Sequence, residues 1–472
     1  MKKLFLPVAV LAFYSMSLNA QTTEANSEEN EEVSADTNEF RQDPPAEPQT
    51  VVTEQQPTMT PMQQPVAAPV DADPVVNTGK GKAHVQLYGF VRNYFYYDSR
   101  KCVQSSAGLF NQIPMAKKDN KHGDDLNEQS SARLLAITTR IGLDLNGPVV
   151  LGAQTSGKIE TDFNGFSSST TMLRIRHAYA QMDWAKWRVL CGQTWHPMYG
   201  EVFPDVLALS SGSPFQPFSR APQLRVDYKA GKNTTLTADA LYQLQYTSVG
   251  PNGASAEYST NAVLPEMYLG LDYKPEHWIL GVGLDICRIK PQQTATAKEN
   301  NESYTKNVDE YVTGFSPIAY MQYTQDLLTI KAKALYGQNT AHLNMMSGYA
   351  ASSYNDDGTV SDYTTINNFT TWLGLSYGKR KMLSLFFGYS KNLGTGDDVA
   401  STSEGIYVRG YDNIDHIYRF CPTFSYNVKA FNLGIEYEAT GAAYGDVDSK
   451  LKVSNTETVV NHRICAMVKY NF

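Results

Sequence analysis

The chain ends with the stretch NHRICAMVKYNF, residues 461–472. Counted back from the last position, every second residue is apolar or aromatic: Phe472, Tyr470, Val468, Ala466 and Ile464. The positions between them include Arg463, Lys469 and Asn471. Apolar residues at every second position are typical of a β-strand with one face toward an apolar environment and the other toward an aqueous one. The sequence therefore ends on such a strand, and its edge needs a partner.

The same alternation starts at residue 83 and continues to the C-terminus in sixteen segments, the first of which is HVQLYGFVRNYFYY at 84–97. Most segments reach the ~9–11 residues that a tilted strand needs to cross a bilayer. Seven short turns, such as NGP at 146–148, AKW at 185–187 and KPEH at 274–277, alternate with longer connections. The eight long loops lie near 99–131, 164–169, 196–221, 247–263, 291–307, 339–367, 394–409 and 445–457.

This layout predicts an all-β fold, a transmembrane antiparallel up-and-down β-barrel of about 16 strands with short periplasmic turns and long extracellular loops. Backbone groups in a bilayer must be paired within the protein, so the sheet must close and the last strand must meet the first. A soluble β-sandwich would rarely sustain such regular alternation of connections. The terminal alternation resembles the C-terminal assembly signal that the barrel-assembly machinery of outer membranes reads.

The N-terminal region divides into two further parts. Residues 1–20 read as a signal peptide, with Lys2 and Lys3, an apolar core and a small-residue cleavage site at Ala20. Residues 21–82 hold twelve acidic residues, three basic residues and eight prolines, and we expect a disordered acidic tether in the periplasm. With a net charge of -8 for the chain, +2 for the signal and 3 − 12 = -9 for the tether, residues 83–472 carry about -1.

Composition also bears on the class of function. The five cysteines are scattered through the chain and suggest neither a disulfide framework nor a zinc site, so we expect no cofactor or metal. The negative net charge does not suggest nucleic-acid binding. The eight histidines form no recognisable motif with a nucleophile or acid, so we expect no enzyme. The 62-residue tail cannot supply the plug domain of a TonB-dependent transporter.

Four short stretches point to a particular family: TRIGLDLNGP at 139–148, GKIETDFNG at 157–165, LRIRHAYAQMDW at 173–184 and GQTWHPM at 192–198. Together they resemble the DcaP-like branch of the outer-membrane porins, most densely over 132–200, and the strand layout extends the resemblance through 83–472. The resemblance implies a trimeric, sixteen-stranded channel for small, often negatively charged molecules. Some members carry an N-terminal coiled coil, whereas this tail is Pro-rich and lacks heptads.

The function is expected to depend on the lumen, because a barrel of ~16 strands encloses an aqueous channel. Alternation places these charged side chains inside: Arg92, Arg140, Lys158, Glu160, Asp162, Arg174, Arg176, Arg225 and Arg463. Four of them are expected to form a basic ladder on one wall: Arg463, Arg92, Arg140 and Arg176. Such rows of charge set the ion preference of pores. The alternative is that the arginines pair with nearby acids, for example Arg174 with Glu160.

The third long loop, 196–221, carries Glu201 and Asp205 in an otherwise uncharged stretch. We expect it to fold into the lumen and to place these carboxylates opposite the arginines; the alternative is a lid outside the barrel. His177 breaks the outward apolar pattern, so either a bulge shifts the register or this face meets another subunit. Trp195 and His196 are expected at the outer membrane boundary.

Taken together, the sequence predicts an outer-membrane porin of a Gram-negative bacterium, with its tail in the periplasm, for passive diffusion of small polar or anionic solutes. The expected partners are outer-membrane lipids, the barrel-assembly machinery, these solutes and two further copies in a homotrimer. The alternative is a surface-exposed binding or adhesin-type barrel with a closed lumen, in which long loops such as 339–367 bind partners.

Overall fold

The structure is a computed structural model that describes residues 75–77, 82–165, 171–300, 302–410 and 412–472. The expected signal peptide and most of the expected tether lie outside these residues. Within them, β1 (Val75–Asn77) pairs with the start of the first barrel strand, with Val75 opposite His84. Strand pairing therefore begins inside the segment that the sequence assigned to the tether.

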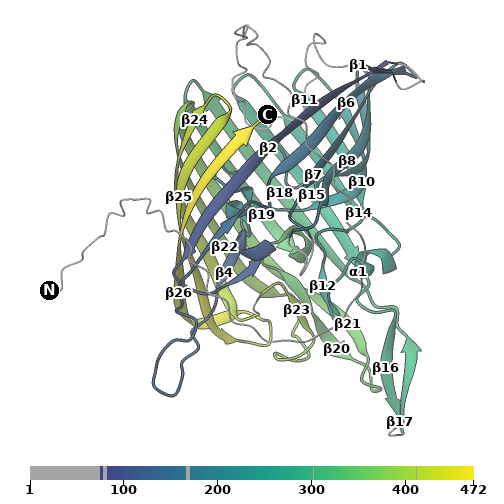
Figure 1. Ribbon diagram of the computed structural model, residues 1–472. Helices are drawn as coiled ribbons and strands as arrows, with labels where there is room; N and C mark the ends of the chain where they lie inside the picture. The colour runs from purple at the N-terminus through teal and green to yellow at the C-terminus, as the bar shows by residue number, and fades with distance from the viewer. Residues whose placement is uncertain (1–74, 78–81, 166–170, 301, 411) are drawn as a thin grey trace, which may run out of the picture. The chain divides into compact units, whose positions relative to one another are not determined.

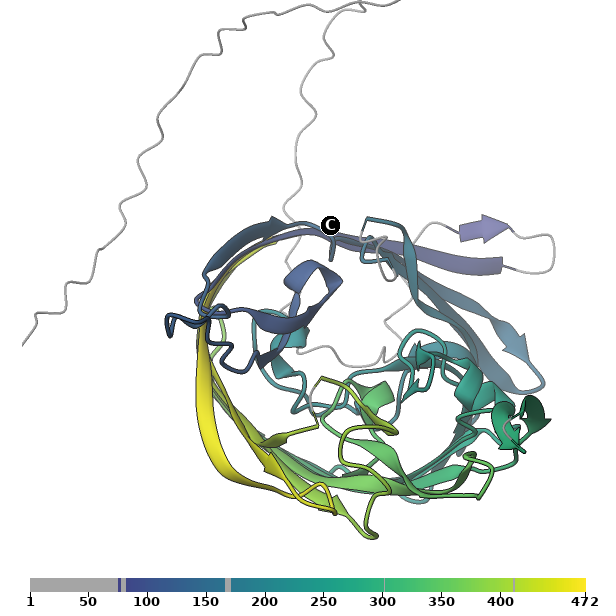
Figure 2. The same cartoon turned by 90° about the horizontal axis from the view of Figure 1, so that it is seen from below.

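Sixteen antiparallel strands close into a barrel, as the sequence predicts (Figures 1 and 2). Each strand is hydrogen-bonded to the next around the ring, and the last pairs with the first. In ring order the strands are β2 (Lys82–Asp98), β6 (Arg140–Val150), β7 (Ala153–Asp162), β8 (Arg174–Asp183), β9 (Trp187–Trp195), β10 (Arg220–Lys229), β11 (Thr234–Leu241), β14 (Glu266–Tyr273), β15 (Trp278–Ile289), β18 (Val312–Gln325), β19 (Leu328–Gln338), β21 (Val360–Gly378), β22 (Lys381–Thr395), β24 (Ile414–Val428), β25 (Phe431–Val447) and β26 (Val453–Asn471).

The remaining elements belong to the long connections. β5 (Ser131–Leu135) precedes β6 and pairs with the far half of β2. The others are β3 (Cys102–Ser105), η1 (Ser106–Gly108), β4 (Phe110–Pro114), η2 (Leu209–Gly212), β12 (Val249–Gly250), β13 (Gly253–Ala254), α1 (Glu257–Asn261), β16 (Thr294–Glu299), β17 (Glu302–Asn307), η3 (Ala341–Leu343), β20 (Gly348–Tyr354) and β23 (Ile406–Val408). Among the residues described, no helix is long and apolar enough to cross a membrane.

The seam of the barrel lies at the C-terminus. The backbone N–H groups of Gly89 and Phe472 each donate to the other residue's carbonyl oxygen, both at 3.1 Å. A Cβ at Gly89 would lie 2.5 Å from the Arg140 carbonyl oxygen and 2.6 Å from the Phe472 ring, so the seam requires glycine there. The terminal aromatic residue thus covers the point where the sheet closes.

Exposure along β26 follows the predicted alternation. Val468 and Phe472 are 49 % and 55 % exposed on the outer surface, with Ile464 and Tyr470 similarly exposed and Ala466 half-buried between them. Arg463 and Cys465 are buried on the inner face. Exposed apolar side chains on the outside of a closed barrel are the lipid-facing surface of a transmembrane protein.

One turn differs from its expected place. The sequence suggests a turn at Asn146–Pro148, but β6 continues through these residues with a register shift between Asn146 and Val149. The chain reverses instead at Leu151 and Gly152, whose φ angles are +51° and +75°. Two positive φ values match the right-handed twist of a tight hairpin, and a bulge accommodates Pro148, which has no N–H to donate.

Candidate functional site

The third long loop, residues 196–219 in the structure, folds into the lumen. Its Leu207 N–H donates to Glu436 of β25 at 2.7 Å, and Gln216 accepts a hydrogen bond of 2.9 Å from the indole N–H of Trp372 on β21. Both partners are buried side chains of the barrel wall. The sequence left open whether this loop lies inside or outside, and these contacts place it inside.

The first long loop also enters the lumen, which the sequence did not suggest. Its β3–β4 hairpin and η1 lie within the ring in the view along the barrel (Figure 2). Arg463 donates to the Gly108 carbonyl oxygen at 2.8 Å, and the Tyr444 hydroxyl donates to the Pro114 carbonyl oxygen at 2.6 Å. Two loops therefore occupy part of the lumen, and both contact β25.

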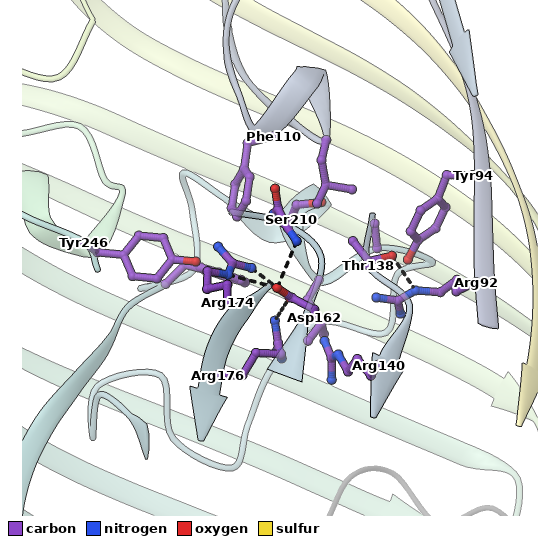
Figure 3. A pocket seen from close by; sticks show the side chains of 15 residues that line it. Arg92, Tyr94, Phe110, Thr138, Arg140, Asp162, Arg174, Arg176, Ser210 and Tyr246 are labelled. Atoms are coloured by element: carbon purple, nitrogen blue, oxygen red, sulfur yellow. Dashed lines mark hydrogen bonds and ion pairs between the residues drawn. The ribbon is translucent and has the colours of Figure 1, made fainter. Parts of the chain in front are cut away.

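Between these loops and the wall lies a group of arginines that we call the arginine cluster: Arg92, Arg140, Arg174, Arg176 and Arg220. Two carboxylates on β7 hold part of it together (Figure 3). Arg174 makes two hydrogen bonds to Asp162, at 3.0 and 2.8 Å. Arg176 bridges both acids, at 2.6 Å from Glu160 and 2.7 Å from Asp162.

The cluster carries more positive than negative charge. Arg140 lies 3.5 Å from Glu160, whereas Arg92 donates to the Thr138 hydroxyl at 3.0 Å and Arg220 to the Tyr246 hydroxyl at 3.1 Å. Five arginines against Glu160 and Asp162 give 5 − 2 = +3. Arg140 Nε and Arg220 Nη1 are buried and have no hydrogen-bond partner among the described residues.

A cavity of about 30 Å³ lies beside the cluster, enough for one or two waters. Phe110 of the first long loop and Ser210 of the third line it opposite the arginines (Figure 3). The side chains of Asn164 and Ser210 are buried there with polar atoms that lack partners in the described chain. Burial, the largest effect, raises the pKa of the nearby Tyr199 hydroxyl, although the surrounding arginines oppose this. The arginines, Asn164 and Ser210 together make the lining of the cavity rich in hydrogen-bond donors.

A β-bulge on β8 explains His177. Glu160 lies opposite His177 and Thr161 lies opposite Ile175, so Arg176 is the extra residue. The bulge turns both Arg176 and His177 inward, and His177 Nδ1 lies 2.9 Å from the Thr194 hydroxyl. Of the two explanations left open by the sequence, the register shift is the one found. The register places Arg174 opposite Asp162, so Glu160 pairs with Arg176 and not with Arg174 as expected.

The expectation for Trp195 and His196 was wrong. Trp195 stacks on Tyr199 with ring centroids 4.1 Å apart, beneath the guanidinium of Arg220 at 4.8 Å. His196 is buried and lies 2.7 Å from Glu266. Both side chains are held by the loop that turns into the lumen, so neither reaches the membrane boundary.

Arg463 does not join the other arginines in one ladder. It makes two hydrogen bonds to Asp98, at 2.7 and 2.8 Å. Along β2, Asp98 lies six residues from Arg92, roughly 20 Å at the rise of a strand. The residue opposite Arg92 on β26 is Lys469 instead. The basic row on this wall is therefore shorter than expected and ends in a lysine.

The two loop carboxylates do not face the arginines either. Glu201 pairs with Lys274 at 2.6 Å, and Asp205 pairs with Lys331 at 2.6 Å. Asp205 also accepts a hydrogen bond of 2.7 Å from Ser376. Asp205 therefore holds the third long loop to β19 and β21, and Glu201 holds it to the turn after β14. Within the residues that the structure describes, no carboxylate of this loop pairs with the arginine cluster.

Two other predicted residues are paired locally on the inner wall. Lys158 lies 2.8 Å from Asp144, and Arg225 lies 2.9 Å from Asp239. The sequence missed Arg220 because strict alternation from Arg225 assigns it to the opposite face. Loop residues such as Phe110 carry no periodic signal, and only their contacts reveal them.

No family model and no curated protein matches this sequence. Among solved structures, the outer membrane channel DcaP of Acinetobacter baumannii has a TM-score of 0.61 and 24 % sequence identity, with 84 % of this chain and 99 % of that chain covered. This chain has the DcaP fold. OmpT expressed in the outer membrane of Vibrio cholerae has a TM-score of 0.50 and 12 % identity, with 84 % and 100 % covered. The fold expected from the family resemblance is confirmed.

Proposed function

We propose that the protein is an outer-membrane channel of a Gram-negative bacterium, water-filled and used for passive diffusion of small anionic or polar solutes. DcaP, whose fold it shares, is an outer membrane channel. The outer surface supplies the apolar belt that lipid requires, and long and short connections lie at opposite ends of the strands. No catalytic role is part of this proposal.

The arginine cluster is the observation that carries the proposal. Its charge of +3 lies where the first and third long loops approach the wall, and we expect solutes to pass close to it. A low-dielectric wall focuses the field of such charges and raises the local concentration of anions. Guanidinium groups also match carboxylate and phosphate oxygens with paired hydrogen bonds.

The arginines divide into two roles. Arg174 and Arg176 are engaged by Asp162 and Glu160, so their geometry is fixed and they contribute mainly to the potential. Arg92 is half-buried and has no carboxylate partner in the described chain, so its remaining donors can bind a passing anion. Arg220 also lacks a carboxylate partner, but it is fully buried against Trp195 and Tyr246 and contributes through its charge. We expect Arg92 to make the direct contact with solute.

A second candidate is the closed binding barrel. Part of the lumen is apolar, since Met198, Val202 and Phe215 of the third long loop pack against Trp372 and Phe386 of the wall. If this packing blocked the channel, the long loops would be the functional surface. The purified chain in planar bilayers separates the two: a channel gives ohmic single-channel steps, and a closed barrel gives none.

A swelling assay tests the solute class. Liposomes that contain the protein should admit small dicarboxylates faster than divalent cations of similar size. Equal rates would contradict the anion preference, and no swelling with any solute would contradict the channel. We further propose a homotrimer inserted by the barrel-assembly machinery, in contact with outer-membrane lipids, with the acidic tail in the periplasm.

A further inference from the structure

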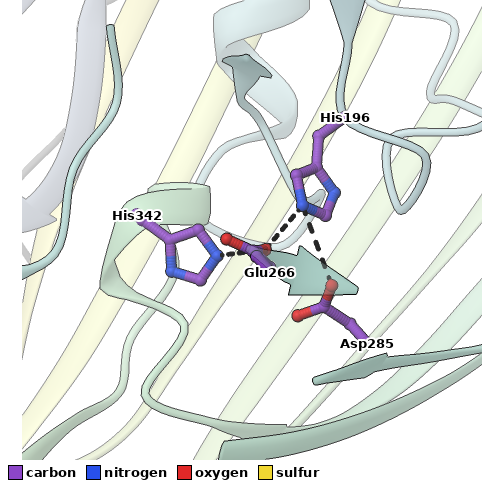
Figure 4. A group of neighbouring side chains, drawn as sticks. All are labelled: His196, Glu266, Asp285 and His342. Atoms are coloured by element: carbon purple, nitrogen blue, oxygen red, sulfur yellow. Dashed lines mark hydrogen bonds and ion pairs between the residues drawn. The ribbon is translucent and has the colours of Figure 1, made fainter. Parts of the chain in front are cut away.

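Four buried side chains that do not belong to the arginine cluster meet inside the barrel: His196, Glu266, Asp285 and His342 (Figure 4). His196 opens the third long loop directly after β9, and His342 lies in η3 of the sixth long loop. Glu266 begins β14, and Asp285 lies on the neighbouring β15. Each is at most 2 % exposed. Residues this far apart in sequence form no motif, so only the fold shows them together.

The polar atoms of this group converge. His196 Nε2 lies 2.7 Å and His342 Nε2 lies 2.9 Å from the same carboxylate oxygen, Glu266 Oε1. Asp285 Oδ1 lies 3.8 Å from His196 Nε2. One ligand atom from each residue can be chosen such that all four lie within 4.8 Å of one another. Two imidazoles and two carboxylates form a donor set that suits zinc and neighbouring transition metals.

The hydrogen bonds leave this group incomplete. Asp285 Oδ1 and His342 Nδ1 have no hydrogen-bond partner in the described chain, although both residues are buried. A buried carboxylate oxygen without a partner is costly. Two ionised carboxylates and one divalent cation sum to zero charge, and the cation would be the partner that Asp285 Oδ1 lacks.

We propose that His196, Glu266, Asp285 and His342 bind one divalent transition-metal ion, with Zn²⁺ as the natural probe. In a tetrahedral site with bonds of about 2.0–2.1 Å, ligand atoms lie about 3.3 Å apart, so His196 and His342 must each move away from Glu266 by roughly half an ångström. Binding through His196 Nε2 places a proton on Nδ1, and the Met198 N–H, now 3.2 Å from Nδ1, must turn away.

The bound metal would hold the constriction in place. The third and sixth long loops already contact each other, since Phe218 N–H donates to the Leu343 carbonyl oxygen at 2.8 Å and Asn344 Nδ2 donates to the Phe218 carbonyl oxygen at 2.9 Å. A shared ion would join His196 of one loop and His342 of the other to two wall strands. The metal would therefore fix the third long loop, which lies in the lumen, to the sixth long loop and to the wall, whatever solute passes.

The test is Zn²⁺ titration of the purified full chain after treatment with a chelator. We expect about one Zn²⁺ per chain and a higher midpoint of thermal unfolding when it is bound. Changing an outer-shell partner commonly weakens metal binding ~10–100-fold, so loss of a direct ligand in H342Q should weaken it at least tenfold. H122Q, which changes an exposed histidine in the first long loop, should bind as the wild type does.

D285N is the second variant, because Asp285 Oδ1 has no hydrogen-bond partner in the described chain and an amide keeps the size of the carboxylate. Its unfolding midpoint without metal should stay near that of the wild type, while its Zn²⁺ affinity falls at least tenfold. The proposal is overturned if the wild type binds no Zn²⁺, or if H342Q and D285N bind it as tightly as the wild type, which would mean an adventitious ion only.

Discussion

At the scale of single residues, the lumen is dominated by buried ion pairs whose partners come from different strands. The sequence identified many of the charged residues but not their pairing. Alternation assigns a face to each residue, whereas pairing also depends on register and on bulges such as the one at Arg176. Asp98 shows this limit: it was not singled out, yet it is fully buried and holds Arg463.

We predict that D98N destabilises the barrel strongly. The change leaves the Arg463 guanidinium buried without its charged partner, and breaking a buried pair from one side costs about 3–5 kcal/mol. Asp183 and Arg188 form a comparable pair that is about one-quarter exposed. The matched control D183N should therefore cost less than about 1 kcal/mol. Urea unfolding of both variants is the measurement; equal costs would contradict the role assigned to burial.

At the scale of elements, the strands were predictable and the loops were not. All sixteen segments became strands because a lipid-facing and a lumen-facing surface impose a period of two. The third and first long loops have no such period, and their positions depend on side-chain contacts with distant strands. For the same reason the sequence could not show that Glu201 and Asp205 meet lysines.

Glu436 is the clearest attachment point of the third long loop. Its carboxylate accepts hydrogen bonds from the Leu207 N–H at 2.7 Å and from the hydroxyls of Ser211 and Thr423, both at 2.8 Å. We predict that E436Q loosens the loop, because an amide offers one acceptor oxygen and leaves a buried donor unsatisfied, at about 1–3 kcal/mol.

The readout for E436Q is single-channel conductance, which should rise and become noisier as the loop leaves the wall. The control E276Q changes an exposed carboxylate in the short turn between β14 and β15, and its conductance should match that of the wild type. An unchanged conductance in E436Q would show that this contact does not hold the loop in the channel.

At the scale of the whole molecule, closure of the sheet depends on the last residue. Phe472 exchanges two backbone hydrogen bonds with Gly89, and its ring lies over that glycine. We predict that deletion of Phe472 lowers the yield of folded barrel in the outer membrane while export to the periplasm continues. F472Y keeps the ring and the backbone bonds and should assemble normally. Heat-modifiable mobility measures the folded fraction, and normal assembly of the deletion would contradict the prediction.

The central claim is that the arginine cluster makes the pore prefer anions. The double variant R92Q/R220Q tests this claim and takes the partner from no buried carboxylate, because neither arginine pairs with a carboxylate in the described chain. The matched control K379Q/R380Q removes the same charge from exposed positions in the short turn between β21 and β22. Any preference should weaken with salt, as the Debye length falls from about 30 Å at 0.01 M to about 3 Å at 1 M.

The most direct measurement is the reversal potential across a tenfold KCl gradient at low salt. The wild type and K379Q/R380Q should show the sign of an anion-selective pore, and R92Q/R220Q should move toward zero. A cation-selective wild type, or a double variant with the same reversal potential as the wild type, would contradict the account.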